Sequence, residues 1–346
     1  MVSIFLSAVF FAVSTKESKL AQRLLHDIQD DASAATRADW SIRAELAEGL
    51  SAATASISPK YFYDPLGSRL FESICELDEY YPTRTEAGIF KHHAADIAAT
   101  VGQGTTLIDL GAGNCAKAAR LFPLLKPRQY VPVDISTEFL REAVAGLRQK
   151  FPAIPMQEVA MDFSSSLHLP PSVERDQRLF FYPGSSLGNF SPEQALQFLR
   201  RLRHGLLLGQ SGGLLIGVDL VKEPALLDAA YDDALGVTAA FNRNVLLHVN
   251  RLLGSDFVLA DWRHRGFYNA ACTRVEMHLE ACRDVTVRWG DGGRRQFRQG
   301  ERIHTESSYK FTPDGFDELL RQAGFGHSKM WFDPHQWFML CYARPL

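Results

Sequence analysis

The 346-residue sequence lacks several features that would mark particular classes of protein. It has no basic excess, since 37 Lys and Arg face 40 Asp and Glu, and this balance gives no support for a nucleic-acid partner. Its five cysteines are scattered and never spaced as Cys-x-x-Cys, which favours free thiols in a reducing cytoplasm and no structural metal site. Repeats, low-complexity segments and proline-rich linkers are also missing.

A long hydrophobic run is absent as well. The apolar run at residues 4–13 is too short to span a bilayer and has no basic flank typical of a signal peptide. We therefore expect a cytoplasmic protein without a membrane partner. The length suits two domains, or one large core with an insertion.

What the sequence does contain is the start of a nucleotide-binding α/β domain. An apolar strand at residues 105–110 runs into Gly111 and Gly113, and glycines there allow a sharp turn and close approach of a ligand to backbone. A second strand at residues 130–134 ends in Asp134, whose carboxylate can accept hydrogen bonds from both ribose hydroxyls. These features predict an adenosine-containing cofactor. The glycine pattern fits NAD and S-adenosylmethionine equally well.

Strands and helices then alternate as a parallel sheet requires. A weak third strand ends near Asp162 and Phe163, an acid beside an aromatic ring that suits an adenine pocket. A fourth strand at 178–183 runs into a turn of small residues at 184–189, at the sheet edge where such folds bind ligands. A fifth strand is expected at 213–221.

The remaining segments do not continue this regular alternation of strands and helices. Residues 19–53 and 226–250 have helical spacing of apolar residues. Strands are expected at 277–289 and 296–311 around a glycine turn, and period-two alternation places Glu306 and Ser308 on one strand face.

A tyrosine-rich segment precedes the glycine loop. Residues 60–90 carry four tyrosines that we expect in loops or at helix ends, where packing and a functional role are equally plausible. Pro65 and Gly67 predict a turn, with Ser68 as the cap of the following helix.

Taken together, these motifs resemble the S-adenosylmethionine-dependent histidine Nα-methyltransferases of ergothioneine biosynthesis. The resemblance extends from about residue 31 to the C-terminal part. The matching pieces are Tyr61 to Asp64, Gly67-Ser68, Leu70-Phe71, Glu79 to Arg84, Leu110-Gly111-x-Gly113, Gly188-Asn189, Asp219 to Lys222, Ala230 to Asp233, Gly236 to Asn244, and Thr305-Glu306-x-Ser308-x-Lys310-Phe311.

The resemblance implies a Rossmann-like class I methyltransferase domain and a family-specific α+β substrate domain. It implies cofactor contacts at Gly111, Lys117, Asp134, Asp162, Phe163 and Gly184. It also implies substrate contacts at Asn189 and Tyr231 for the α-amino-acid group, and at Tyr80, Met277, Glu306 and Ser308 for the imidazole. Tyr63 would lie near the reacting amine as the catalytic residue.

The expected division of the chain follows from this resemblance. Residues 1–83 would contribute to the substrate domain, 84–219 would form the cofactor-binding part, 220–309 would be the substrate-domain insertion, and 310–346 would complete the methyltransferase domain. We expect a monomer acting on a small amino acid. The alternatives are a methyltransferase of the same fold acting on another amino acid such as a tryptophan derivative, a nicotinamide-dependent oxidoreductase, and a catalytically silent cofactor-binding protein.

Overall fold

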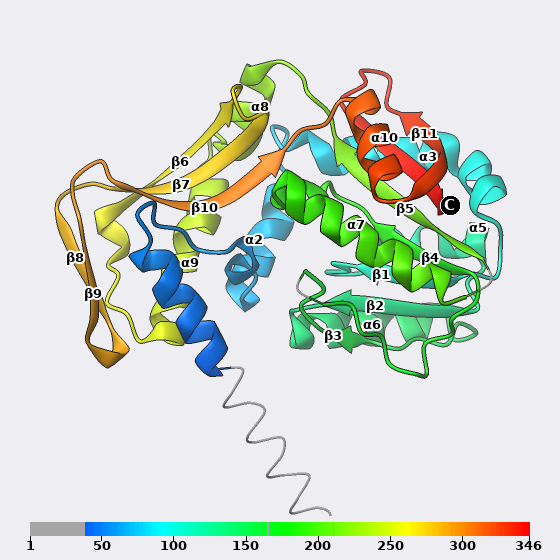
Figure 1. The fold of residues 1–346 in the computed structure, drawn as a ribbon, viewed down its shortest axis with the longest axis horizontal. Helices are drawn as coiled ribbons and strands as arrows, with labels where there is room; N and C mark the ends of the chain where they lie inside the picture. Colours follow the sequence, from blue (N-terminus) through cyan, green and yellow to red (C-terminus); the bar gives the residue numbers. More distant parts are fainter. Residues whose placement is uncertain (1–38, 165, 210) are drawn as a thin grey trace, which may run out of the picture.

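The larger sheet of the computed structural model has seven strands. The structure describes residues 39–164, 166–209 and 211–346 (Figure 1). Its strand order is β11-β12-β5-β4-β1-β2-β3. The strands are β1 (Thr106–Leu110), β2 (Gln129–Asp134), β3 (Val159–Ala160), β4 (Arg178–Tyr182), β5 (Gly212–Asp219), β11 (Phe325–Phe332) and β12 (Phe338–Pro345). Strands β1 to β5 pair in parallel, whereas β12 pairs antiparallel with both β5 and β11.

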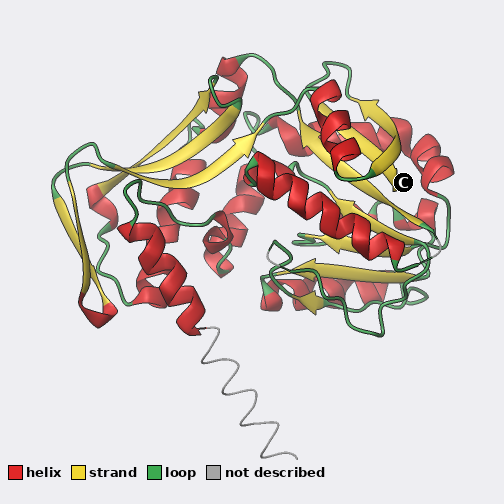
Figure 2. Ribbon diagram, viewed as in Figure 1, coloured by secondary structure: helices red, strands yellow, loops and turns green. Residues whose placement is uncertain are grey.

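Helices cover both faces of this sheet (Figure 2). The helices are α3 (Tyr81–Val101), α4 (Ala116–Ala119), α5 (Phe122–Leu125), α6 (Thr137–Lys150), α7 (Pro192–Leu207) and α10 (Pro313–Gln322). Neighbouring strand residues alternate between two cores: Ile108 packs in the core of α7 and α10, and Leu107 in the core of α3 and α6. Burial on both faces explains why the parallel strands are continuous apolar runs.

A smaller three-stranded sheet, of order β10-β7-β6, follows β5 along the chain and precedes α10. Its strands are β6 (Trp262–Asn269), β7 (Arg274–Ala281) and β10 (Arg302–Tyr309). Helices α8 (Pro224–Tyr231) and α9 (Val237–Leu253) and the short turn η3 (Leu259–Asp261) come before it. Helix α9 packs through Phe241 and Val245 against Met277 and Leu279 of β7, which gives this part a core of its own.

The strand prediction around the glycine turn was partly wrong. The turn η4 (Gly290–Gly292) joins only a short hairpin, β8 (Val285–Trp289) with β9 (Gly293–Phe297). Strand β7 instead pairs with β10 and with β6, a strand that the sequence did not predict. The pairing of β7 with β10 is non-local, and the turn between β6 and β7 has no glycine-containing hairpin signature, so no turn signal marks either pairing.

The N-terminal part of the described chain joins the smaller sheet. Residues 39–51 are helical, and Ile57 N donates to His304 O of β10 at 2.9 Å. A 3-10 turn, η1 (Pro59–Phe62), leads into α2 (Pro65–Cys75). Residues 4–13 and the expected helix start at residue 19 lie outside the described residues.

The predicted cap of α2 was wrong. Asp64 is the N-cap, because its Oδ1 accepts from Gly67 N at 2.7 Å, and Pro65 occupies the first helical position. Proline there costs no hydrogen bond, so it starts the helix and makes no separate turn. Asp64 also accepts from Asn244 of α9 at 2.7 Å, which ties α2 to that helix.

None of the helices within residues 39–164, 166–209 and 211–346 has the length and apolar character needed to cross a membrane.

Candidate functional site

A cavity opens where the carboxyl edge of the large sheet faces the smaller sheet. It is bounded by the loop after β4, by η1, α2 and the start of α3, by α8 and α9, and by β7 and β10. All seven residues expected at the substrate line it, together with Gly184: Tyr63, Tyr80, Asn189, Tyr231, Met277, Glu306 and Ser308. The structure thus brings together residues spread over about 245 positions of sequence, although the role of each stays a prediction.

Gly188 sets the distance between the two sheets at this cavity. A Cβ at position 188 would lie 2.7 Å from the backbone oxygen of Tyr309, so only glycine lets β10 pack directly on η2 (Ser186–Asn189). This close approach places Asn189 and Ser308 on the same cavity wall.

Glu306 is the most unusual group in the cavity. Only 8% of the residue is exposed, and no hydrogen bond to its carboxylate is found among the described residues. Burial raises the pKa of Glu306 to about 7, although the positive charge of Lys310 acts to lower it. A buried polar group without a partner is costly. Its presence in a cavity wall therefore points to a ligand that supplies a hydrogen-bond donor.

Three tyrosine hydroxyls belong to the same cavity. The pKa of Tyr63 lies well above its usual value because of burial first and the charge of Glu306 second. Burial likewise raises the pKa of Tyr80 and of Tyr231. All three are phenols at neutral pH, so each can donate one hydrogen and accept another but cannot act as an anionic base.

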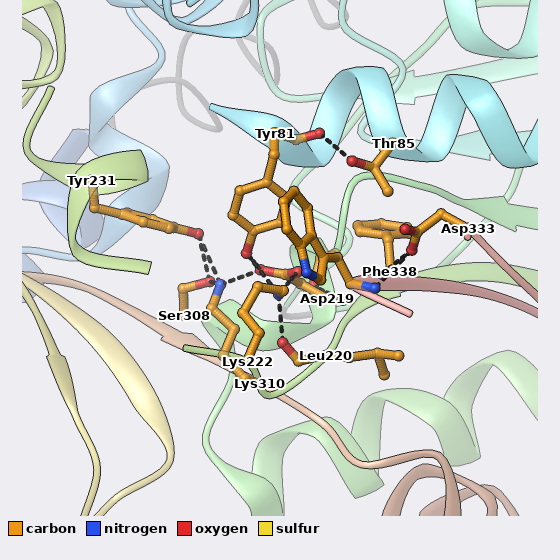
Figure 3. Close-up of polar contacts among 12 residues, drawn as sticks. Tyr81, Thr85, Asp219, Leu220, Lys222, Tyr231, Ser308, Lys310, Asp333 and Phe338 are labelled. Atoms are coloured by element: carbon orange, nitrogen blue, oxygen red, sulfur yellow. Dashed lines mark hydrogen bonds and ion pairs between the residues drawn. The ribbon is translucent and has the colours of Figure 1, made fainter. Parts of the chain in front are cut away.

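Tyr231 and Ser308 of the cavity wall also belong to a buried polar cluster (Figure 3). The Tyr231 hydroxyl and Ser308 Oγ lie 2.8 Å apart, and Lys310 Nζ donates to both at 3.1 and 2.9 Å. Asp219, at the end of β5, pairs with Lys310 at 2.8 Å and with Lys222 at 2.6 Å. The cluster joins the large sheet to β10.

Tyr81 completes this cluster from the side of α3. Its hydroxyl donates to Asp219 Oδ2 at 2.6 Å and accepts from Lys222 Nζ at 2.7 Å. Tyr81 therefore has a structural partner, whereas its neighbour Tyr80 lines the cavity.

The glycine loop and Asp134 form a second polar group at the ends of β1 and β2. Asp134 Oδ2 accepts from Gly113 N and Oδ1 from Ser136 N, each at 2.9 Å. Each oxygen keeps a free lone pair, so the carboxylate can still accept from two hydroxyls. Gly111 and Gly113 have φ of +71° and +52°, values that glycine adopts without strain. The residues fit a ribose placed against this edge.

The other expected cofactor residues surround the same edge. A Cβ on Gly111 would lie 3.7 Å from the Phe163 ring, so that ring lies against the glycine loop. Asp162, beside it, accepts from Ser164 N at 3.0 Å and pairs with Lys60 at 3.4 Å.

Lys117 connects this edge to the cavity. Its Nζ pairs with Glu86 at 2.7 Å and would lie 3.0 Å from a Cβ on Gly184, which has φ of +80°. Glu86 of α3, 1% exposed, also accepts from Gly184 N at 2.8 Å. An anionic ligand group near Gly184 would therefore meet the Lys117 ammonium.

Sequence reasoning missed several residues of the site. The apolar cavity wall also contains Phe71, Ile74 and Phe241, and Ser185 lies at its edge. Phe71 and Phe241 stand within the family motifs, so the motif letters were an available signal. Glu86 lies inside a 21-residue helix, where no local pattern marks a buried acid.

The sheet order and the polar groups at its carboxyl edge define the class of protein. The fold is that of a Rossmann-like class I methyltransferase, as the sequence predicted. Strands β1 to β5 are parallel, and the antiparallel β12 lies between β5 and β11. The edge for the ligand has a glycine loop and an acid. The chain belongs to the family of SAM-dependent, histidine-specific methyltransferases, whose model matches residues 42–345. It is a methyltransferase whose methyl donor is S-adenosylmethionine, so the alternative of a nicotinamide cofactor is wrong.

Individual relatives differ in their substrates. The histidine N-alpha-methyltransferase of Mycolicibacterium smegmatis is 41% identical over 87% of this chain and 94% of its own. Ergothioneine biosynthesis protein 1 of Neurospora crassa is 30% identical over 78% of this chain but only 31% of its own length. The 4-dimethylallyltryptophan N-methyltransferase of Aspergillus fumigatus is 25% identical over 85% of this chain and 91% of its own.

Proposed function

We propose that the protein transfers methyl groups from S-adenosylmethionine to the α-amino nitrogen of L-histidine. Three transfers give Nα,Nα,Nα-trimethylhistidine (hercynine) for ergothioneine biosynthesis. The observation that carries this proposal is Glu306, a buried carboxylate without a partner among the described residues, in the wall of a cavity beside the cofactor edge. An imidazole N–H would supply the missing donor.

The imidazole has one donor and one acceptor nitrogen, and the cavity offers a match for each. Glu306 would accept from the N–H with Ser308 beside it, and the Tyr80 phenol would donate to the other nitrogen. Met277 would pack beside the ring. A ligand without the N–H would leave Glu306 unpaired, at a cost of roughly 1–3 kcal/mol.

The α-amino-acid group would lie toward Asn189 and Tyr231, with Tyr63 next to the amine. The sulfonium of S-adenosylmethionine supplies an electrophilic methyl carbon. The neutral amine uses its lone pair to form the C–N bond while the C–S bond breaks and its electron pair stays on sulfur. The ammonium form of the amine loses one proton to water before each transfer, and the third transfer leaves a quaternary ammonium that has no proton to lose. Orientation of the amine is the main demand on the protein.

The raised pKa of Tyr63 limits what this residue does. A neutral phenol accepts a hydrogen bond from the amine or passes a proton to water, and it does not hold a negative charge. Tyr63 therefore acts by orienting successive amine states. As the amine loses hydrogens, the contacts to the ring and carboxylate keep the substrate in place.

The proposed cofactor contacts lie around the sheet edge that holds the glycine loop and Asp134. Asp134 would accept from the ribose hydroxyls, with the backbone of Gly111 beside it. Asp162 and Phe163 would contact the adenine. Lys117, with Gly184 nearby, would pair with the carboxylate of the methionine part.

The alternative substrate is a tryptophan derivative. An indole has a donor nitrogen but no acceptor, so it would leave the hydrogen of Tyr80 unused, and its second ring needs extra space among Met277, Phe71 and Phe241. Turnover of L-histidine and L-tryptophan should be compared at equal concentration, with S-adenosylhomocysteine binding by calorimetry as a control for the folded cofactor site. Faster turnover of tryptophan would reject histidine as the substrate.

Three further properties belong to this proposal. We propose a cytoplasmic location and a monomer. We also propose that the chain divides into substrate-binding and methyltransferase parts near residues 83, 219 and 309. The core on the three-stranded sheet is separate from the two cores on the faces of the seven-stranded sheet, which supports this division.

A further inference from the structure

Lys310 is buried completely, yet it contacts two residues of the proposed substrate site. Its side chain is 0% exposed. Its three hydrogens have three partners: Asp219 at 2.8 Å, Ser308 Oγ at 2.9 Å and the Tyr231 hydroxyl at 3.1 Å. Burial alone would lower the pKa of Lys310, but Asp219 and Tyr231 outweigh it and raise the pKa, so the ammonium is charged at neutral pH.

The hydrogen count of this group has a consequence for the cavity. Tyr231 and Ser308 have one hydroxyl hydrogen each, and one of these is used in the bond between them. Lys310 has no acceptor, so both oxygens accept from it. Because Tyr231 donates to Ser308 Oγ, the hydroxyl hydrogen of Ser308 remains for a ligand in the cavity that both residues line.

A carboxylate is the kind of ligand group that fits this free hydroxyl hydrogen. Asp219 is 1% exposed and pairs with both Lys310 and Lys222, and the charge of Asp333 also acts on Lys222. The charged groups of the cluster therefore pair with one another, and the hydroxyl hydrogen is what they leave for a ligand. A substrate carboxylate near the Tyr231–Ser308 pair would accept it.

We propose that Lys310 is a positioning residue that holds the Tyr231–Ser308 pair as a hydrogen-bond donor and thereby selects substrates with a free α-carboxylate. The inference rests on the proposed function, because it takes Tyr231 to face the amino-acid end of histidine. Lys310 touches no reacting atom. It acts through the two hydroxyls that it fixes.

The test compares two ligands in three proteins. Binding of L-histidine and of L-histidinamide, which lacks the carboxylate charge, is measured by calorimetry with S-adenosylhomocysteine present, in wild type, Lys310→Met and Lys222→Met. Lys222 is the matched control because it pairs with the same Asp219 but has no recorded contact with Tyr231 or Ser308. We expect Lys310→Met to weaken histidine binding about tenfold or more and histidinamide binding less than about threefold. Lys222→Met should change both ligands by the same factor.

Steady-state rates add an independent readout. Because Lys310 selects the ligand and does not take part in the transfer, Lys310→Met should raise KM for histidine more than it lowers kcat. If Lys310→Met does not fold, the variant Lys310→Met/Asp219→Asn removes both members of the buried pair and should show the same lost preference.

The role of Lys310 would be overturned if Lys310→Met weakened the binding of both ligands equally. It would also be overturned if Lys310→Met and Lys222→Met changed the preference for histidine over histidinamide equally. Neither result would touch the proposed function. If wild-type protein binds S-adenosylhomocysteine but neither binds nor methylates histidine, the proposed function itself is overturned, and the Lys310 proposal falls with it.

Discussion

Replacing Glu306 with glutamine removes the one buried carboxylate of the cavity that has no hydrogen-bond partner among the described residues. Burial raises the pKa of this carboxyl from 4.5 to about 7. A raised pKa means that folding favours the protonated form. The wild type therefore loses stability as pH rises from about 4.5 to about 7, and the loss stays constant at higher pH.

The size of this loss follows from the pKa shift. Each pKa unit corresponds to about 1.4 kcal/mol, so ionised Glu306 costs about 3 kcal/mol in the ligand-free fold. Between pH 5 and pH 8 the stability of Glu306→Gln relative to wild type should rise by roughly 2–3 kcal/mol, because glutamine has no charge to bury.

Urea unfolding at pH 5 and pH 8, followed by tryptophan fluorescence, measures this difference. Trp262 is buried in the same core as Met277 and reports on this part of the chain. The matched control is Glu280→Gln on β7. Burial alone would raise the pKa of Glu280, but hydrogen bonds from Arg263 and Arg302 outweigh it and lower the pKa to about 2. Glu280 therefore does not titrate between pH 5 and pH 8 in the folded protein, and Glu280→Gln should lose the same amount of stability at both pH values.

The same substitution tests the ligand contact. At pH 8, glutamine in place of Glu306 should weaken histidine binding about tenfold to a hundredfold, the usual range for loss of a hydrogen bond to a charged group. A relative stability of Glu306→Gln that does not change with pH would refute the desolvation argument. Unchanged histidine affinity would refute the contact to the imidazole.

Three other substitutions probe the remaining parts of the site. Tyr63→Phe should slow at least one of the three methyl transfers, and rates unchanged from wild type for all three would reject its role in orienting the amine. Gly188→Ala should lower kcat/KM, because its Cβ would clash with Tyr309 at a cost of about 1–3 kcal/mol; wild-type activity would show that the two sheets need no such close contact. Asp134→Asn should weaken S-adenosylhomocysteine binding about tenfold or more in calorimetry, and equal affinity would remove Asp134 from the ribose site.

The local patterns of the sequence were sufficient for the cofactor half of the fold. The glycine loop and the acid of Asp134 each depend on neighbouring residues, and the structure has the strand boundaries close to those expected.

The substrate half depends on contacts that no local pattern records. Strand β6 carries charged residues on its outer face and pairs with β7 across a turn without a hairpin signature, so it was missed. Glu86 of α3 and Lys310, which directly follows β10, become buried only when distant segments meet. For Glu306 and Ser308 the alternation gave a shared face, and the family resemblance suggested a role. The cavity that they line is visible only in the folded structure.

Mass spectrometry of L-histidine incubated with the protein and S-adenosylmethionine tests the central claim most directly. We expect a product that has gained three methyl groups, with fragmentation placing all three on the α-nitrogen. No mass change, or methyl groups on the imidazole ring, would contradict the account.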